Sequence, residues 1–551
     1  MLGVDMREEC IAQWNQEVND WIAYVEQRKA ELEKEDISDS ILGKKVRLHR
    51  QIRALYQVKN GIVMNPELIF DCIDPKRIAV SNDKEVKVYY SELDTKKRTS
   101  HIRLEGNQKD AVKKFANMDN LLVIQGPPGT GKTSVIVEIC AQILMNEPES
   151  RVLVCSETHV AVNNLFHILN EMFDNFEGIR VLDKEIDEEG YRKKFLKETF
   201  IEKYWKKMRD KKVSEKIIHY LEENWTNNEK QFNEMLFYSS RFVGITCSGI
   251  GGMDFAYEHS FDYVIVDEDS KISFPELLMP MCWAKKFILV GDPKQLPPSF
   301  SEEERENMDS LLERIDGKNA FIDRIYNQIP ECAFSMLNIQ HRMSYEIADI
   351  VNKFFYNGLL KNGNNVQSIK GSLRWADYDT NSKWLIPEEG SITQKHFSVY
   401  NLDEVGIVHK IILQEYERYT QILRGRNLKK LVRIEVITPY TGQKRKLSKY
   451  LFNQDDIKQT KEIFKLGIHT IDQIQGRDSE IVIFSIARNI GNSRFIANDR
   501  RLNVAFSRAK ERLWIVGQRK YTDNISVIID GEEKKILNEV AETAIVQKFI
   551  V

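Results

Sequence analysis

Eight consecutive residues, Gly126 to Thr133, have the types and spacing needed to bind phosphate groups. They read Gly-Pro-Pro-Gly-Thr-Gly-Lys-Thr and fit the Walker A pattern G-x-x-x-x-G-K-[ST]. The glycines let backbone N–H groups turn toward phosphate oxygens, and the following helix adds its positive end. We expect Lys132 to reach the β- and γ-phosphates and Thr133 to hold Mg²⁺. The residues predicted to contact the nucleotide here are Gly126, Pro127, Pro128, Gly129, Thr130, Gly131, Lys132 and Thr133.

The residues on either side of this loop support the same interpretation. Residues 121–125 form a short apolar run typical of a buried strand, and residues 134–144 have the pattern of a helix. A glycine-rich turn with an unrelated lysine is the alternative. Because strand, loop and helix occur in the expected order, the sequence favours a site for ATP with Mg²⁺.

A second apolar run ends in two acids. Residues 261–266 are followed by Asp267 and Glu268, and ligands of parallel α/β sheets bind outside the carboxyl ends of the strands. We expect Asp267 to bind Mg²⁺ and Glu268 to orient or deprotonate the attacking water. After the next strand, at 287–290, Gln295 is placed to contact the γ-phosphate or that water. A proline-rich turn is the alternative for Gln295.

Two arginines stand out in the second half, where the predicted sheet has no phosphate loop of its own: Arg342 follows a predicted strand, and Arg508 lies in a predicted helix. Each arginine taken alone is typical of a protein surface. An ATPase needs cations near the γ-phosphate, and an arginine finger accelerates hydrolysis by about 10³–10⁵-fold. Together these observations suggest a nucleotide held between two sheets, with Arg501, Arg508 and Lys510 close together along one helix spanning residues 500–510.

The strand–helix alternation predicts an α/β fold with two parallel-sheet domains in tandem. We predict an N-terminal accessory region (1–100) of helices and a small β element, a first domain (101–300) with a helical insertion at about 166–240, and a second domain (301–551). The acidic run 301–306 is interpreted as a linker. The expected strands are 62–63, 68–70, 78–80 and 86–90 in the accessory region, 121–125, 152–155, 242–246, 263–266 and 287–290 in the first sheet, and 334–337, 434–438, 467–471, 480–486 and 513–516 in the second.

The accessory region also contains a basic segment, residues 41–57, predicted to be helical. Its cations are Lys44, Lys45, Arg47, Arg50 and Arg53. A solvated face is the simpler interpretation of such a helix, and contact with nucleic acid is the alternative.

The bulk composition is that of a water-soluble, nearly neutral protein. The chain has 551 residues, 42% of them hydrophobic, and a formal net charge of −3, so any nucleic-acid site has to be a local basic groove. The sequence lacks an apolar run long enough to span a membrane, and its first residues do not resemble a secretory signal. Seven scattered cysteines without a C-x-x-C pair indicate reduced thiols in an intracellular protein, cytoplasmic or nuclear, without a zinc site.

The motifs between about residues 101 and 520 closely resemble, in order, those of superfamily 1 helicases, specifically the up-frameshift-like group of superfamily 1B. The matching segments are 104–112 (the Q motif), 126–133, 154–165 (motif Ia), 244–248, 267–270 (motif II), 291–298 (motif III), 340–343 (motif IV), 398–405, 437–443, 470–478 (motif V) and 501–510 (motif VI). The resemblance implies that the two parallel-sheet domains are RecA-like and that the chain is an ATP-dependent helicase that moves 5′→3′ on single-stranded RNA or DNA.

The same resemblance assigns further roles. It implies that Gln108 reads adenine, that His341 stacks on the base, that Gly476 lies near the nucleotide, that Arg342 contacts the γ-phosphate and that Arg508 is the finger. The residues that it places on the nucleic acid are Ser156, Thr158, Asn163, Thr246, Thr438 and Thr470. A buried or helix-capping role is the alternative for each threonine.

Some positions depart from the family pattern. Asp269 adds a carboxylate beside the expected metal, Asp478 stands where glutamate is usual, and His341 replaces a common tyrosine. The first 100 residues are too short for the family's full stalk and β-barrel. Three functions therefore stay open: a duplex-unwinding helicase, a translocase or remodeller that unwinds poorly, and an ATP-gated nucleic-acid clamp. Protein partners are expected at the N-terminal region or the helical insertion.

Overall fold

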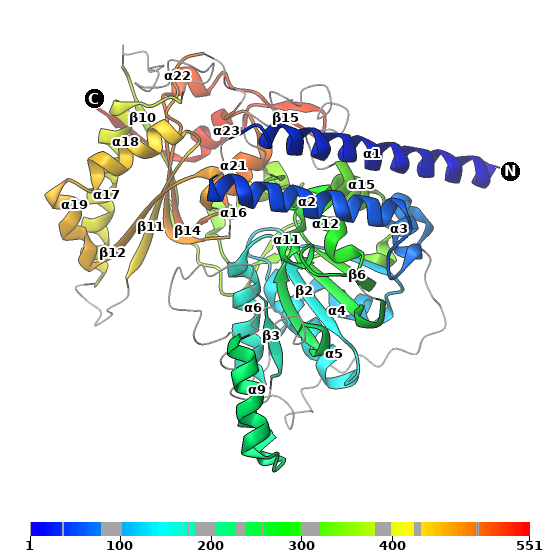
Figure 1. Ribbon diagram of the computed structural model, residues 1–551. Coiled ribbons are helices and arrows are strands. Elements are labelled where there is room, and N and C mark those ends of the chain that lie inside the picture. Colours follow the sequence, from blue (N-terminus) through cyan, green and yellow to red (C-terminus); the bar gives the residue numbers. More distant parts are fainter. Residues whose placement is uncertain are drawn as a thin grey trace. The chain divides into compact units, whose positions relative to one another are not determined.

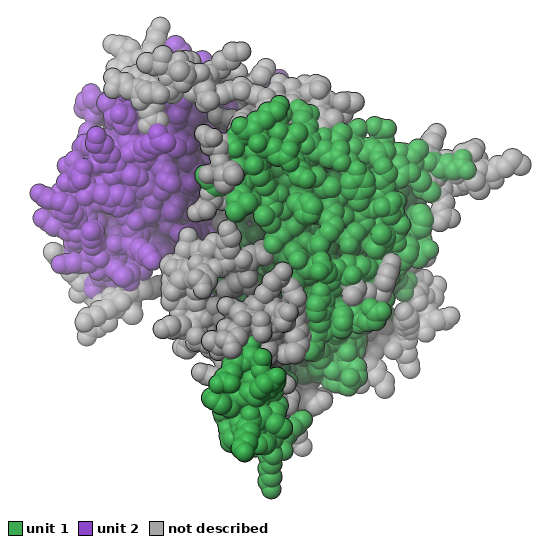
Figure 2. All heavy atoms as spheres, in the orientation of Figure 1, with its two compact units in different colours: residues 1–126, 131–293, 297–337 green, residues 127–130, 294–296, 338–551 purple. Residues whose placement is uncertain are grey.

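The computed structural model of the chain describes residues 2–35, 38–78, 102–173, 176–181, 205–206, 208–227, 237–255, 257–298, 320–380, 398–423, 431–474, 476–491, 493 and 495–551. These residues divide into two compact units (Figure 2), and each is described by itself. Unit 1 comprises residues 1–126, 131–293 and 297–337, and unit 2 comprises residues 127–130, 294–296 and 338–551. The predicted strand at 86–90, part of the one at 78–80, and the acidic run at 301–306 lie outside the described residues.

Unit 1 is built on a parallel sheet with the strand order β3-β4-β2-β5-β6-β1-β7. Its strands are β1 (Leu121–Gln125), β2 (Val152–Ser156), β3 (Gly178–Arg180), β4 (Phe242–Thr246), β5 (Phe261–Asp267), β6 (Ala284–Gly291) and β7 (Phe334–Met336). Its α-helices are α1 (Leu2–Leu32), α2 (Asp39–Lys59), α3 (Pro66–Ile73), α4 (Asn107–Asn117), α5 (Lys132–Asn146), α6 (His159–Met172), α9 (Glu215–Asn227), α11 (Cys247–Ile250), α12 (Phe274–Met281) and α15 (Ala320–Gln328), with 3₁₀ turns at Pro75–Arg77, Tyr257–His259, Asp269–Lys271 and Glu331–Ala333.

Alternate residues of the central strands enter two cores, one on each face of this sheet. Leu121 and Val123 of β1 pack with the N-terminal helices, α12 and α15, whereas Leu122 and Ile124 pack with α4, α5 and α6. This alternation follows from the two-residue period of a strand. The helices α1 and α2 lie side by side (Figure 1). Both contribute side chains to the core of unit 1, such as Trp21 from α1 and Leu55 from α2.

Unit 2 contains a second parallel sheet with the order β12-β11-β13-β14-β10-β17. Its strands are β10 (Leu373–Tyr378), β11 (Val432–Thr438), β12 (Phe464–Thr470), β13 (Ser479–Ser485), β14 (Ala509–Val516) and β17 (Ile545–Phe549), with the short pairs β8 (Ile339–Gln340) and β9 (Lys361–Asn362), and β15 (Val527–Ile529) and β16 (Glu532–Lys534). Its α-helices are α16 (Tyr345–Phe355), α17 (Leu402–Leu423), α18 (Thr441–Leu451), α19 (Asp455–Gln459), α20 (Ile471–Ile474), α21 (Asp499–Phe506), α22 (Arg519–Thr522) and α23 (Ile536–Thr543), with a 3₁₀ turn at Thr460–Glu462. The two parallel sheets confirm the predicted α/β class with two RecA-like domains.

Several strand predictions were wrong. Residues 68–70 lie in helix α3, which Pro66 and the Asn65 cap begin, because a short apolar run fits a buried helix as well as a strand. Residues 62–63 form neither a strand nor a helix. The strand predicted at 334–337 in the second sheet is β7, which pairs with β1 in the first. Strands β3, β10 and β17 were not predicted.

The start of the predicted helical insertion and the end of one predicted helix also differ from the prediction. Residues 166–172 belong to α6, which packs on the first sheet, so the excursion from the sheet does not begin at 166. The helix predicted over 500–510 ends at Phe506. Arg508 therefore lies in the turn that leads into β14.

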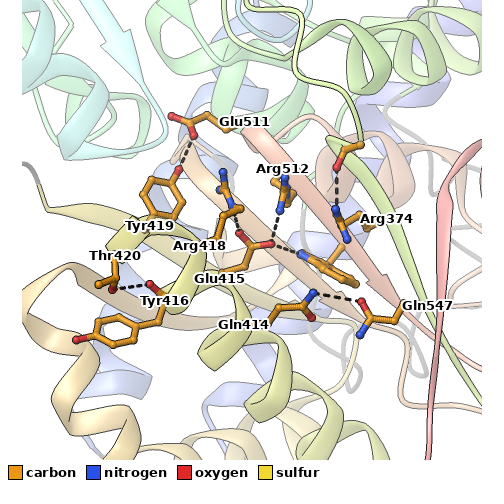
Figure 3. A network of polar contacts seen from close by, with 12 residues as sticks. Arg374, Gln414, Glu415, Tyr416, Arg418, Tyr419, Thr420, Glu511, Arg512 and Gln547 are labelled. Atoms are coloured by element: carbon orange, nitrogen blue, oxygen red, sulfur yellow. Dashed lines mark hydrogen bonds and ion pairs between the residues drawn. The ribbon is translucent and has the colours of Figure 1, made fainter. Parts of the chain in front are cut away.

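A buried ion-pair network joins α17 to the second sheet (Figure 3). The carboxylate of Glu415 accepts hydrogen bonds from Arg512 Nη1 (2.8 Å), Trp514 Nε1 (2.8 Å) and Arg418 Nε (2.7 Å). Burial alone would raise the pKa of Glu415, but Arg418 and Arg512 hold it below its usual value. The carboxyl group is therefore ionised at neutral pH and stabilises unit 2.

Replacing Glu415 with glutamine is expected to lower the free energy of unfolding at pH 7 by about 2–4 kcal/mol, because two arginines lose their counter-charge. The depressed pKa means that this stabilisation is present above the unfolded-state pKa near 4.5 and is lost as the pH falls through the folded-state value. Urea unfolding at pH 7 and below pH 4.5 measures both effects. Glu417→Gln, an exposed position on the same helix, is the control. Equal losses in the two variants would contradict the prediction.

Candidate nucleotide site

The two ends of the predicted phosphate loop, Gly126 and residues 131–133, belong to unit 1. Gly126 N donates to Gly291 O (2.8 Å) and so ties the loop to the end of β6. Gly131, which precedes α5, has φ +79°, a left-handed conformation that glycine adopts without strain. A Cβ at Gly126 would lie 2.0 Å from Lys132 Cγ. The absence of a side chain at Gly126 thus lets Lys132 fold back and donate to Gly126 O.

Gln108 lies beside the start of α5. It is buried on α4, its Oε1 accepts from Glu105 N (2.9 Å), and its Nε2 lies 2.6 Å from where a Gly131 Cβ would be. The structure therefore brings the predicted adenine reader next to the phosphate loop. Adenine recognition itself stays a prediction.

The acidic end of β5 lies at the same sheet edge as the phosphate loop. β6 pairs with both β1 and β5, with Gln125 opposite Gly291 and Asp267 opposite Val290. Burial, with a smaller contribution from the charge of Glu268, raises the pKa of Asp267 to about 7, although the nearby Lys132 acts to lower it. Because β1 and β5 end at the same edge of the sheet, the carboxyl group of Asp267 lies close to Lys132 of the phosphate loop.

Glu268 has an unusual backbone conformation for a residue other than glycine. Its φ is +59°, its N–H donates to Asp267 Oδ1 (2.9 Å), and its own Oε2 is buried without a hydrogen-bond partner among the described residues. Lys271 Nζ lies 3.8 Å from that oxygen. Strained, incompletely paired groups of this kind concentrate at functional sites.

These donors fit Mg²⁺. The ion typically takes one or two carboxylates together with substrate phosphates and waters, and Asp267 and the Thr133 hydroxyl are oxygen donors of this kind. In the described part of the chain, no group of three or more His, Cys, Asp or Glu side chains forms a metal cage. At a site of this kind the substrate phosphates and waters supply the remaining ligands of the ion.

The additional acid of this motif, Asp269, is fully buried and has a partner that the sequence did not indicate. It accepts a hydrogen bond from Tyr326 Oη (2.8 Å) on α15. Its Oδ1 also lies 1.8 Å from where a Gly291 Cβ would be, so only glycine fits at that position. Asp269 thus links the end of β5 to α15 and β6.

In unit 2, the predicted arginines cluster at the turn between α21 and β14. Arg342 Nε lies 3.3 Å from Asp478 Oδ2, and Lys510 Nζ lies 2.9 Å from Asp478 Oδ1. Arg508 is buried, with its Nη2 donating to Gln295 Oε1 (3.0 Å) and its Nε to Val504 O (3.2 Å). The aspartate that replaces the usual glutamate therefore positions Arg342, and Arg508 is held by several bonds.

Two matches to family models cover most of the chain. Models described as "AAA domain" match residues 103–181 and 172–302, and residues 308–520. The chain belongs to the superfamily 1 helicases of the Upf1-like type. It is 29% identical over 485 residues to an uncharacterised ATP-dependent helicase of Methanocaldococcus jannaschii, covering 75% of this chain and 67% of that protein.

Two further relatives are fungal helicases. The chain is 28% identical over 467 residues to the DNA polymerase alpha-associated DNA helicase A of Saccharomyces cerevisiae, covering 75% of this chain and 65% of that protein. It is 26% identical over 455 residues to the ATP-dependent helicase upf1 of Schizosaccharomyces pombe, covering 76% and 45%. The chain thus spans between about half and two thirds of these relatives.

Two other residues of this Upf1-like helicase, His341 and Gly476, are also predicted to contact the nucleotide. His341 Nδ1 lies 2.6 Å from Asn365 Oδ1, and a Cβ at Gly363 would lie 2.3 Å from the imidazole ring. Gly476 has φ +83°, so the turn before β13 requires glycine for its conformation. Base stacking by His341 and nucleotide contact by Gly476 stay predictions.

Four of the six residues predicted to contact nucleic acid come together in pairs at the carboxyl ends of strands. Ser156 lies opposite Thr246 in the first sheet, and Thr438 lies opposite Thr470 in the second. Thr158 and Thr246 also cap helices, accepting from Ala161 N (3.4 Å) and Gly249 N (3.0 Å). Asn163 Oδ1 accepts from Arg180 Nε (2.9 Å).

Glu404 lies in the matched segment 398–405, but the sequence did not indicate the buried polar network that it forms in unit 2. Glu404 accepts from Ser485 Oγ (2.6 Å), Ala487 N (2.8 Å) and Tyr378 Oη (3.0 Å), and burial raises its pKa to about 7. Ala487 has φ +65°, and no local sequence signal marks that conformation.

Among the described residues, no helix is both long enough and apolar enough to cross a membrane.

Proposed function

We propose that this helicase-family chain hydrolyses ATP to move 5′→3′ along single-stranded nucleic acid. The main support is the phosphate loop with Lys132 at the same sheet edge as Asp267 and the incompletely paired Glu268. Thr133 and Asp267 would hold Mg²⁺, which neutralises charge on the β- and γ-phosphate oxygens when bound. Glu268 orients and deprotonates the attacking water.

Unit 2 contains the other residues that the family resemblance assigns to ATP hydrolysis. Arg508 would stabilise charge on the transferred phosphoryl group, Arg342 would contact the γ-phosphate, and Gln295 would sense it. The hydrogen bond from Arg508 to Gln295 supports the proposal that the two residues respond together to the γ-phosphate. These contacts would differ between the ATP-bound state and the state after hydrolysis. The difference would change the affinity for the nucleic-acid strand, as conformational steps do in many ATP-driven enzymes.

The proposed track is single-stranded DNA or RNA, gripped through phosphates and sugars with little sequence preference. Ser156, Thr158, Asn163, Thr246, Thr438 and Thr470 are the proposed contacts. One relative is named a DNA helicase, which makes DNA the first track to test. The seven free cysteines support an intracellular location.

Steady-state ATPase activity, titrated separately with single-stranded DNA and RNA of equal length, tests the proposal. Salt is kept constant because phosphate contacts make affinity steeply salt-dependent. We expect one polymer to stimulate the ATPase rate at least about tenfold, since a motor hydrolyses ATP mainly while it is bound to nucleic acid. Lys132→Ala, expected to be inactive, controls for contaminating ATPases. Activity that neither polymer changes would contradict a motor.

A labelled duplex with a 5′ or a 3′ overhang then tests direction and unwinding. Strand separation that requires the 5′ overhang is the expected result. ATPase stimulation without strand separation would favour a translocase or remodeller instead.

A further inference from the structure

Helix α2 presents three arginines, Arg47, Arg50 and Arg53, to the body of unit 1. They are three residues apart, so they lie along one side of the helix. On the basis of sequence alone, this basic helix was interpreted as a solvated face or a nucleic-acid contact. The structure shows that all three guanidinium groups are bound by unit 1 itself.

The arginines hold one loop and the helix beside it. Arg50 Nη1 donates to Ser248 O (2.9 Å), and Arg53 Nη2 donates to Met253 O (2.6 Å) and to Gly251 O. Arg47 forms a bidentate pair with the buried Glu276 of α12, with Nη2 2.8 Å from Oε2. We call Arg50, Arg53 and the segment 248–254, which comprises the end of α11 and the loop after it, the arginine clamp.

The approach of α2 to this loop is too close for side chains. A Cβ at Gly252 would lie 2.6 Å from Arg50 Nη2 and 3.1 Å from Gly249 O. A Cβ at Gly251 would lie 2.4 Å from Met279 Sδ and 3.0 Å from Arg50 Cβ. The glycines therefore allow the clamp to form, and a methyl group at Gly252 must displace the Arg50 guanidinium.

The clamped loop continues directly from a proposed nucleic-acid contact. Thr246 ends β4 beside Ser156 of β2, and its hydroxyl accepts from Gly249 N (3.0 Å). The segment 246–254 is thus fixed by Thr246 at its start and by α2 at the carbonyl groups of residues 248, 251 and 253.

We propose that Arg50 and Arg53 are positioning residues for the nucleic acid, which set the grip of the segment 246–254 on the strand without touching it. This inference rests on the proposed function, because it presupposes a strand bound at Thr246. It assigns the N-terminal helices a role in substrate affinity, distinct from ATP hydrolysis.

The test measures the dissociation constant of the full chain for a fluorescent single-stranded oligonucleotide at several salt concentrations, together with basal ATPase activity. For the Arg50→Ala, Arg53→Ala double variant we expect at least about fivefold weaker binding with an unchanged salt slope, because no phosphate contact is removed. Basal ATPase activity and its KM for ATP should stay within about twofold, since the clamp is outside the proposed ATP site.

Two further variants separate positioning from direct charge effects. Gly252→Ala changes no charge and should weaken binding like the double variant, because it dislodges Arg50. Lys44→Ala, Lys45→Ala removes two cations from the same helix and should bind like the wild type. Melting temperatures of all variants report whether unit 1 stays folded, and Gly252→Ala, with its single added methyl group, still tests the inference if the double variant unfolds.

The outcomes are distinguishable. Wild-type affinity in both the double variant and Gly252→Ala would overturn the clamp while leaving the proposed function intact. Weakened binding by the lysine variant, with the salt slope reduced by about 0.7 per lost contact, would replace positioning with direct phosphate contact. Failure of the wild type to bind either single-stranded DNA or RNA would overturn the proposed function and the inference together.

Discussion

Replacing Arg508 with alanine is expected to lower kcat for ATP hydrolysis by about 10³–10⁵-fold, with a much smaller change in KM for ATP, because an arginine finger acts mainly in the transition state. The side chain is buried and is held by Val504 O and Gln295 Oε1. It is therefore preorganised, which is what electrostatic stabilisation of a transition state requires. Stopped-flow or steady-state ATPase assays with saturating nucleic acid measure the effect.

Because Arg508 is buried, its loss can also destabilise unit 2, so each variant needs a thermal melt. Arg508→Lys keeps the positive charge but loses the planar fork and should recover only part of the activity. Arg519→Ala, which breaks a partly exposed ion pair with Asp523 (3.2 Å) in the same unit, is the control and should keep wild-type turnover. Unchanged turnover in a folded Arg508→Ala variant would remove this residue from the finger role.

Replacing Glu268 with glutamine is expected to reduce kcat by about 10²–10⁴-fold while ATP still binds, because the amide cannot take a proton from water. The structure supports the choice of this acid, since Glu268 Oε2 is buried without a hydrogen-bond partner in the described residues and lies 3.8 Å from Lys271 Nζ. Single-turnover hydrolysis and binding of a fluorescent ATP analogue measure the two effects separately.

The neighbouring acid provides a matched control. Asp269 already accepts a hydrogen bond from Tyr326 (2.8 Å), and asparagine keeps an acceptor oxygen for that bond. We therefore expect Asp269→Asn to reduce kcat by less than about tenfold, as for loss of a supporting contact. Comparable losses at both positions would mean that negative charge in this motif matters, and that Glu268 is not a specific base.

The sequence by itself determined the features that depend on neighbours along the chain. The phosphate loop at 126–133 was visible because its backbone conformation is a local property of glycine spacing. The central strands β1, β2, β5 and β6 were visible because buried parallel strands are continuous apolar runs. The acids at 267 and 268 could be placed beside the loop because parallel strands end at one edge of the sheet.

The tertiary structure alone decided what depends on distant partners. Strand β7 joins the first sheet through pairing with β1, which its three residues could not specify. Asp269 is bonded to Tyr326, fifty-seven positions later, and Arg53 to backbone oxygens about two hundred positions later. Charge on a helix shows that a partner is needed, but long-range packing decides whether that partner is solvent, nucleic acid or, as for α2, a loop of the same unit.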